Sequence, residues 1–285
     1  MVTKKVRMPT GRAMSIGRAM SIAELQEAAH SVGHDYAAGS PHIKHQEIYF
    51  RVVSSVQQVI GEIIDRQGEC RVLEVGAGHG TFTDHIVAVG ARVEVNEMSG
   101  PSAEQLRRRF RNNESVRVTL VRDGRPPAHA EPIDLVVCIS VLHHIPDYLS
   151  AVSELMGRIR PGGVFLSFQD PLWYPRRSRL SRRLDRAAFL FWRIPRGDLR
   201  LGFKNVVRRS RGRHDETNTF DMVEYHVVRQ GVDEEALTKL LRAGFRDVER
   251  FSYWSTQSSA MQALGARLCW PNTFGLIARR RLPDG

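Results

Sequence analysis

Residues 72–80 read Val-Leu-Glu-Val-Gly-Ala-Gly-His-Gly, and this stretch decides the fold of the chain. Its first four residues are a mainly apolar, β-branched run that is typical of a buried strand, and the alternating glycines after it indicate a tight turn. Between Thr81 and Val87 the apolar residues return at the spacing of a helix. The sequence therefore predicts a strand, a glycine-rich loop and a helix, and the N–H groups that open the helix attract anionic groups.

The spacing of the glycines discriminates between cofactors. A dinucleotide-binding loop has the pattern G-x-G-x-x-G, whereas here the third glycine comes one residue early and Thr81 stands in its place. This spacing weakens the case for NAD or FAD. Together with the acid before it, the loop resembles motif I of the class I S-adenosylmethionine-dependent methyltransferases, where the loop backbone lies along the methionine part of the cofactor. The resemblance implies cofactor contacts from Glu74, Gly76, Ala77, Gly78 and Gly80.

Two more predicted strands follow and end in acidic residues. Residues 92–97 form the first, and the resemblance implies that the carboxylate of Glu97 accepts both ribose hydroxyls of the cofactor. Met98 would then offer a polarizable side chain to the adenine face. Residues 116–124 end in Asp123 and Gly124, where the family places a side chain near the adenine amino group. The alternatives are a solvated strand-end acid for Glu97 and an ordinary Asp-Gly turn at 123–124.

A fourth and a fifth predicted strand extend the resemblance. Residues 133–140 are almost continuously apolar, and the Pro-Gly-Gly at 161–163 looks like the turn before a strand that reaches Phe168. The resemblance implies that Ser140 and Val141, at the end of the fourth strand, also contact the cofactor. It covers residues 55–170 strongly. The C-terminal part is matched weakly, by a predicted helix at 233–241 and predicted strands at 245–251 and 274–278.

The resemblance implies an α/β fold with a doubly wound, seven-stranded, mostly parallel sheet. At 285 residues the chain can bury a substantial core. We expect a disordered basic tail at 1–20, an N-terminal helical cap at 21–66, a cofactor-binding Rossmann-like core at 67–170, a basic substrate lid at 171–230, and the C-terminal part of the core at 231–285.

Two adjacent histidines are the candidates for catalysis. His143 and His144 follow the fourth strand, at the edge of the sheet where open α/β folds bind ligands. A histidine can take a proton from a hydroxyl or an amine. The resemblance implies that His143 faces the transferred methyl group as a general base and that His144 lies close behind, while the alternative is a role in packing and loop hydrogen bonds. The substrate site has four further candidates: Asp170, Trp173, Tyr174 and His42.

No metal site is predicted. The histidines near the expected site lack a tight pair on one helix or a flanking carboxylate at ligand spacing. Cys70, Cys138 and Cys269 are far apart in the sequence and indicate neither a disulfide framework nor a zinc site. Together with the absence of an apolar run of about 20 residues, this favours a cytoplasmic protein without a transmembrane segment.

The net charge of +11 is concentrated in two segments. Fourteen basic and two acidic residues lie between Arg176 and Arg213, and residues 1–20 hold five basic residues and no acid, so the rest of the chain is slightly acidic. A solvated, arginine-rich helix face would explain the run. The alternatives are attraction of an anionic substrate or an acidic carrier protein, contact with nucleic acid, and docking on a membrane surface. Nucleic acid is disfavoured because the segment has no known RNA-binding motif and the core is not basic.

We expect an enzyme that transfers a methyl group from S-adenosylmethionine to an oxygen, and less readily a nitrogen, of a small molecule such as a specialised metabolite in antibiotic biosynthesis. The acceptor is anionic or carrier-bound if the basic run serves it. Two alternatives stay open. One is a non-methylating rearrangement or cyclisation on the same fold, and the other is methylation of a nucleic acid or a carrier-bound substrate. The sequence determines neither the acceptor nor the oligomeric state.

Overall fold

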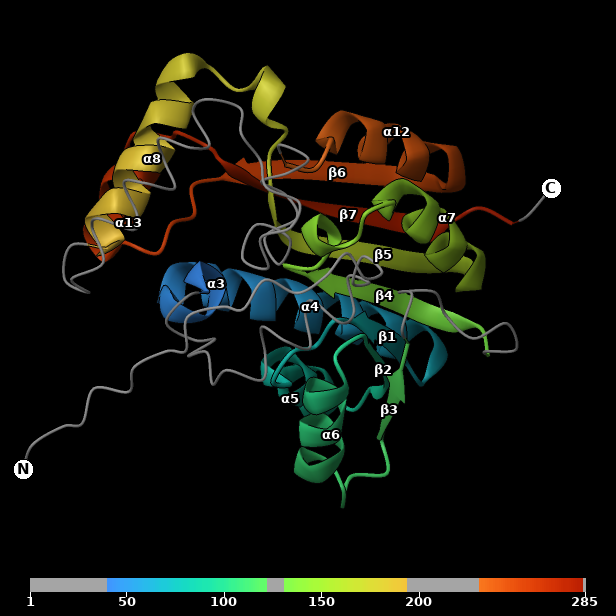
Figure 1. Ribbon diagram of the computed structural model, residues 1–285. Coiled ribbons are helices and arrows are strands. Elements are labelled where there is room, and N and C mark those ends of the chain that lie inside the picture. Colours follow the sequence, from blue (N-terminus) through green and yellow to red (C-terminus); the bar gives the residue numbers. More distant parts are fainter. Residues whose placement is uncertain (1–39, 122–130, 194–230, 284–285) are drawn as a thin grey trace, which may run out of the picture.

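The computed structural model describes residues 40–121, 131–193 and 231–283, and these form one seven-stranded sheet in the order β3-β2-β1-β4-β5-β7-β6 (Figure 1). The first five strands are parallel, and β7 is antiparallel to both of its neighbours. The expected doubly wound, mostly parallel sheet is confirmed. The strands are β1 (Arg71–Val75), β2 (Arg92–Glu97), β3 (Val116–Leu120), β4 (Ile133–Ile139), β5 (Ile159–Pro171), β6 (Phe245–Tyr253) and β7 (Thr273–Arg281).

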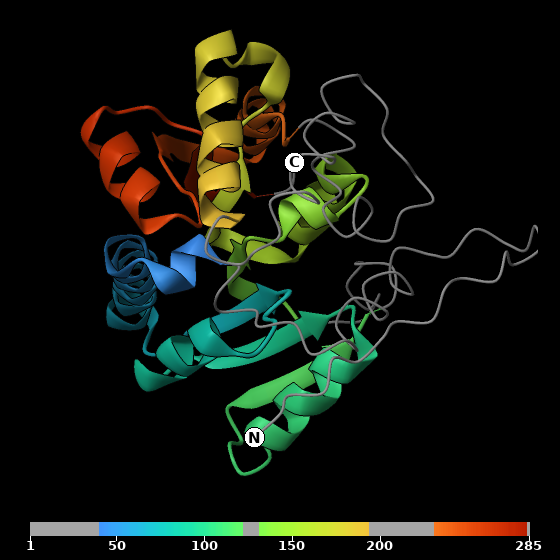
Figure 2. The ribbon, with the colours of Figure 1, turned by 60° about the vertical axis from the view of Figure 1, so that its left-hand side comes forward.

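Helices cover both faces of the sheet (Figure 2). One face is covered by α4 (Gln46–Gln67), α5 (Thr81–Ala88) and α6 (Gly100–Arg109), and the other by α7 (Tyr148–Arg158) and α12 (Glu234–Gly244). The other helical segments are α3 (Pro41–Lys44), α8 (Arg179–Arg193), α13 (Ser259–Arg267) and the single turns η1 (Leu142–His144) and η2 (Tyr174–Arg176).

The alternation of side chains along the central strands produces two cores. In β4, which is buried along its whole length, Leu135, Val137 and Ile139 belong to the core under α4, and Val136 and Cys138 belong to the core under α7. A strand covered on both faces is apolar at almost every position. Polar groups that could serve a ligand are therefore expected where the strands end.

Some predicted features lie outside the described residues. β3 ends at Leu120, earlier than predicted, and Asp123 and Gly124 fall between two described ranges. The same holds for the predicted basic tail at 1–20 and for residues 194–230 of the predicted lid. The division into cap, core and lid stays a prediction.

Two elements differ from expectation. β5 begins at Ile159, so the glycine pair after Pro161 lies within the strand and not in a turn before it. Gly162 has a φ of +82°, and the pairing with β4 skips residues there. The second difference is α13, between β6 and β7, which the sequence patterns do not predict. This helix begins after Ser258, whose hydroxyl accepts a hydrogen bond from the N–H of Met261.

Three segments far apart in the sequence meet at the carboxyl ends of the parallel strands (Figure 1). Lys44, at the end of α3, donates from Nζ to the carbonyl of Gln257 at 2.6 Å, and Nε2 of the following histidine lies 2.7 Å from the carbonyl oxygen of Thr256. On α8, the carboxylate of Asp185 accepts from Nδ2 of Asn272 at 2.8 Å. These bonds connect the N-terminal and C-terminal parts of the chain at the edge where a ligand would bind.

Gly265 lets α13 pack on Trp254, and this contact can be tested. A Cβ at position 265 would lie 2.4 Å from the indole ring, which is buried and donates from Nε1 to the carbonyl of Met261 at 2.9 Å. We expect Gly265→Ala to lower the free energy of unfolding by ~1–3 kcal/mol, because the ring must shift. The control Gly61→Ala, in α4, meets nothing within 4 Å and should raise it by up to ~1 kcal/mol. Equal urea midpoints for the two variants would contradict this packing.

Candidate active site

The loop between β1 and α5 is a series of left-handed glycines. Gly76, Gly78 and Gly80 have φ values of 68°, 56° and 79°, a conformation that residues with a side chain rarely adopt. A Cβ on Gly76 would lie 2.6 Å from Cγ2 of Val141, and one on Gly80 would lie 2.7 Å from the ring of Phe110. Glycine is therefore required at these two positions by space as well as by backbone conformation.

Glu97 holds this loop from the end of β2. The side chain is buried, and Oε2 accepts from the N–H of Gly78 at 3.2 Å while Oε1 accepts from Met98 and Ser99 at 2.9 and 3.0 Å. Burial raises the pKa of Glu97, and the three N–H groups counteract that rise. Oε2 accepts a single bond within the described residues. Since a carboxylate oxygen can accept two, Oε2 can also accept from a ligand hydroxyl.

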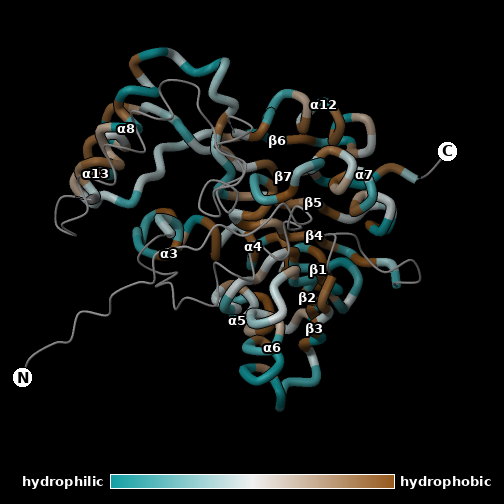
Figure 3. The backbone as a smooth tube through the Cα atoms, in the orientation of Figure 1, coloured by the Kyte–Doolittle hydropathy of each residue, from teal (hydrophilic) through white to brown (hydrophobic). Residues whose placement is uncertain are grey.

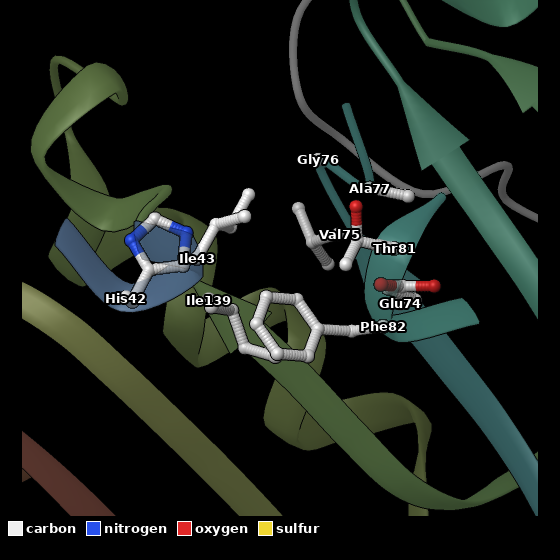
Figure 4. A pocket seen from close by; sticks show the side chains of 9 residues that line it. All are labelled: His42, Ile43, Glu74, Val75, Gly76, Ala77, Thr81, Phe82 and Ile139. Carbon is white, nitrogen blue, oxygen red and sulfur yellow. The ribbon is translucent and has the colours of Figure 1, made fainter. Parts of the chain in front are cut away.

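A pocket lies against the glycine loop, with Glu74 and Thr81 on one side and His42 of α3 on the other (Figure 4). Glu74 is buried, and its Oε2 accepts from Oγ1 of Thr83 at 2.6 Å. Burial raises the pKa of Glu74 to about 7, against the opposing effect of the Thr83 hydroxyl. Thr83 is a site residue that the sequence analysis missed. Its signal is its place in the first turn of α5, on the side of the helix that faces β1.

His42 is buried at the edge of this pocket without a polar partner among the described residues. The residue is 2% exposed, and its ring stacks on Phe82 of α5 with 5.8 Å between centroids. Neither ring nitrogen has a hydrogen-bond partner in the part of the chain that the structure describes. Burial, and to a smaller extent the proximity of His143, lowers the pKa of His42 to about 3. The pocket is thus faced by a neutral imidazole whose donor and acceptor are both unused, which is costly unless a ligand pairs them.

His143 and Asp170 form a buried pair where β4 and β5 end. Nδ1 of His143 lies 2.9 Å from Oδ1 of Asp170, and the backbone N–H of His143 donates to the same oxygen at 3.2 Å. Burial lowers the pKa of His143 to about 3 and raises that of Asp170 to about 7. The ring of His144 packs on that of His143 with 4.0 Å between centroids. With Nδ1 directed at a carboxylate, Nε2 of His143 is the ring nitrogen that can accept a proton.

The strand ends next to this pair have unusual backbone conformations. Ser140, after β4, has a φ of 57°, and Gln169, before Asp170, has a φ of 68°. The backbone N–H of Gln169 donates to the hydroxyl of Tyr253 at 2.9 Å, and its Nε2 donates to Oγ of Ser255 at 2.6 Å. Such conformations cluster at functional sites. Sequence reasoning missed Gln169 and Tyr253, since neither lies in a recognisable motif.

Two of the predicted substrate residues lie apart from this site. Trp173 lines a second pocket, beneath α8, together with Leu184 and Trp270. Its backbone N–H donates to Glu234 at 3.0 Å, so the chain after β5 is held against the start of α12. Tyr174 follows in η2, where the guanidinium of the neighbouring Arg177 lies 5.4 Å from its ring centroid. Only His42 and Asp170 of the four substrate candidates lie with the glycine loop and His143.

Within residues 40–121, 131–193 and 231–283, no three His, Cys, Asp or Glu side chains gather closely enough to hold a metal ion. No helix in the same ranges is long and apolar enough to cross a membrane.

Curated relatives were found for the central part of the chain. Residues 73–165 match the family model described as a methyltransferase domain. The ubiquinone biosynthesis O-methyltransferase of Actinobacillus pleuropneumoniae serotype 5b is 30% identical over 100 residues, which is 33% of this chain and 43% of that protein. The enzyme with the same description from Thiobacillus denitrificans is 33% identical over 100 residues, covering 34% and 43%. The chain thus spans less than half the length of the curated relatives it matches.

Solved structures share the fold over most of the chain. The N-methyltransferase NodS from Bradyrhizobium japonicum, in complex with S-adenosyl-L-homocysteine, has a TM-score of 0.52 and 14% identity, and it covers 91% of this chain and 98% of its own. A putative sarcosine dimethylglycine methyltransferase from Galdieria sulphuraria has a TM-score of 0.53 and 12% identity, with the same coverage. The central part of the chain therefore matches a methyltransferase domain, on a fold that it shares with solved methyltransferases. At these identities the solved structures show the fold alone.

The site fits S-adenosylmethionine, the cofactor that the sequence resemblance implies. The loop at Gly76 leaves no room for a Cβ, Glu97 keeps an accepting position on Oε2, and His42 offers two unused ring nitrogens. These features match the amino-acid and ribose parts of S-adenosylmethionine, which carry an ammonium, a carboxylate and hydroxyls.

The buried Glu74 gives a pH-dependent prediction for the ligand-free protein. Its folded pKa of about 7 lies above its unfolded value of 4.5, so the folded state binds the extra proton and Glu74 favours folding less as pH rises through that interval. We expect Glu74→Gln to gain stability relative to the wild type by up to about 3 kcal/mol between pH 4.5 and 8. Urea unfolding at several pH values measures this difference, with the exposed Glu69→Gln as control. Parallel pH curves for wild type and Glu74→Gln would show that the carboxyl is not destabilised by burial.

Proposed function

We propose that this domain transfers a methyl group to an oxygen of a small molecule, with His143 as the general base. The observation that supports the proposal most is the buried His143–Asp170 pair at the carboxyl ends of β4 and β5, beside the glycine loop. S-adenosylmethionine, when bound, supplies the electrophilic methyl group. A cytoplasmic location and a role in antibiotic biosynthesis stay predictions.

The cofactor would lie along the glycine loop. We assign the ribose hydroxyls to Oε2 of Glu97 and the adenine to Met98, which follows it at the end of β2. The methionine end would face the pocket between Glu74 and His42, where a neutral imidazole can donate to a carboxylate. The ends of the loop and of β4 supply the backbone contacts, from Gly76, Ala77, Gly78, Gly80, Ser140 and Val141. Asp123 and Gly124 keep their predicted adenine role, outside the described residues.

His143 would manage the proton of the acceptor. Asp170 orients the ring through Nδ1, so Nε2 can take the proton of a hydroxyl as its oxygen attacks the methyl carbon. The carboxylate of Asp170 then stabilises the imidazolium that forms. An oxygen acceptor fits this arrangement because a hydroxyl is a weak nucleophile that needs a base. The two curated relatives are also described as O-methyltransferases, although each matches only a third of this chain.

A non-methylating reaction is the second candidate, because the cyclase SpnF has the same fold, with a TM-score of 0.52 and 14% identity. The two candidates differ in their products. Incubation with methyl-labelled S-adenosylmethionine and a panel of phenols, catechols and primary amines should yield labelled methyl ethers and S-adenosylhomocysteine. Tight cofactor binding without S-adenosylhomocysteine release on any acceptor would favour the non-methylating alternative, and label only in amines would overturn the oxygen assignment.

The base assignment predicts a specific kinetic result. His143→Ala should lower turnover roughly 10²- to 10⁴-fold while leaving cofactor affinity nearly unchanged. Since the pKa of Asp170 is about 7, wild-type turnover should rise as pH passes that value, and Asp170→Asn should lose this rise because no carboxylate can form. Initial rates from pH 5.5 to 8.5 measure both effects. Near-normal turnover of His143→Ala would remove His143 from the mechanism.

The ribose assignment predicts a loss of binding. Glu97→Ala removes the accepting oxygen, the bond from Gly78 that holds the loop and two bonds at the end of β2, so the dissociation constant for S-adenosylhomocysteine should rise by more than about tenfold. Glu104→Ala, at an exposed position on α6, is the matched control. Calorimetric titration measures both variants. Unchanged affinity in Glu97→Ala would mean that the ribose lies elsewhere.

A further inference from the structure

The exposed apolar side chains of this protein gather on two helices. Six large apolar residues are strongly exposed within the described ranges, and four of them lie on α8 or at α13. Leu180 and Phe191 are on α8, at 59% and 55% exposure, and Leu264 and Leu268 are on α13 and its last turn, at 46% and 45%. The two helices lie side by side in both ribbon views (Figures 1 and 2). Leu180 also lines the pocket beneath α8. Exposed apolar side chains on two adjacent helices are typical of an interaction surface.

The α13 part of this surface carries no acid. Residues 259–269 contain no Asp or Glu, and α13 is mostly hydrophobic along its length (Figure 3). Its inward positions are occupied by Gln262 and Gly265, which pack toward Trp254. The outward positions alternate small apolar residues with Leu264, Leu268 and the single exposed cation Arg267.

On α8, a basic stripe runs beside the apolar one. Arg179, Arg183 and Arg186 are exposed and spaced by four and three residues, so they share one face of the helix. None of the three forms an ion pair with any residue of the described ranges. The single acid of α8, Asp185, is engaged by Arg177 and Asn272. The exposed side of α8 therefore carries apolar side chains and arginines, and it presents no free acid.

The composition of this surface disfavours two occupants. A second copy of the chain docked face to face would bring like-charged arginines together. Residues 1–20 carry five basic residues and no acid, and they would be repelled in the same way. An occupant must instead be anionic and must accept apolar side chains that project from two helices.

We propose that α8 and α13 dock on an anionic lipid surface. Leu180 and Phe191 lie eleven residues apart on α8, about 16 Å along the helix, with arginines along one flank. This arrangement, with Leu and Phe on one stripe and Arg on the next, is that of a helix lying in a membrane interface. A fluid lipid surface receives projecting side chains without a complementary groove, whereas a protein partner needs one. Each arginine near such a surface is attracted by the anionic headgroups.

Vesicle sedimentation with the full chain tests the proposal without requiring activity. Binding to vesicles of equimolar phosphatidylglycerol and phosphatidylcholine should exceed binding to phosphatidylcholine alone by more than about tenfold, and should weaken as salt rises. The double variant Phe191→Ser/Leu264→Ser should lower the partition coefficient by about tenfold or more. So should the triple variant Arg179→Gln/Arg183→Gln/Arg186→Gln.

Matched controls remove the same types of residue from positions outside α8 and α13. Phe50→Ser removes an equally exposed apolar side chain from α4, and Arg111→Gln/Arg117→Gln/Arg246→Gln removes the same charge elsewhere. Both controls should bind anionic vesicles as the wild type does. Three results would overturn the proposal: no binding to anionic vesicles at low salt, equal loss in the controls, or capture of a soluble acidic protein by this face without vesicle binding.

Discussion

The left-handed loop between β1 and α5 is the constraint on which the rest of the site depends. Gly76 extends the pairing of β1 with β2 by donating to the carbonyl of Asn96 at 2.8 Å, and Glu97 fixes the next turn through Gly78. Because a Cβ at Gly76 would collide with Val141, the same turn sets how closely the end of β4 approaches. Val141 leads directly into η1, so the geometry of the cofactor cradle and the position of His143 are established together.

Five imidazole and carboxyl groups are buried at this edge, and burial moves each of them toward its neutral form. The pKa values of His42 and His143 are lowered, and those of Glu74, Glu97 and Asp170 are raised. Shifts of this kind are concentrated at functional sites. Between about pH 4.5 and 6.5 the two classes oppose each other, since acid favours the folded state through the carboxyls and the unfolded state through the histidines. The site can therefore hold many buried polar groups without a steep overall pH dependence of folding.

Local signals explain which features could be predicted from the sequence. The glycine loop, β2 and β4 are each specified by a few adjacent residues, and their predicted positions agree closely with the structure. The pairing of His143 with Asp170 could not be predicted, because it depends on the register of β4 against β5, in which Ile139 pairs with Phe168. Neither could α13, whose position depends on the distant fit of Gly265 against Trp254.

The arginines near the active site differ from those of α8 in their ion pairs. The two arginines nearest the end of β5 are neutralised within the fold, since Arg176 pairs with Asp233 and Glu234, and Arg177 pairs with Asp185. Attraction of an anionic acceptor toward His143 would require unpaired arginines at this position. On α8, which follows in the chain, Arg179, Arg183 and Arg186 have no ion pair with any described residue. We therefore relate the charge of the basic segment to binding at a surface. The reaction itself is assigned to the pocket beside the glycine loop.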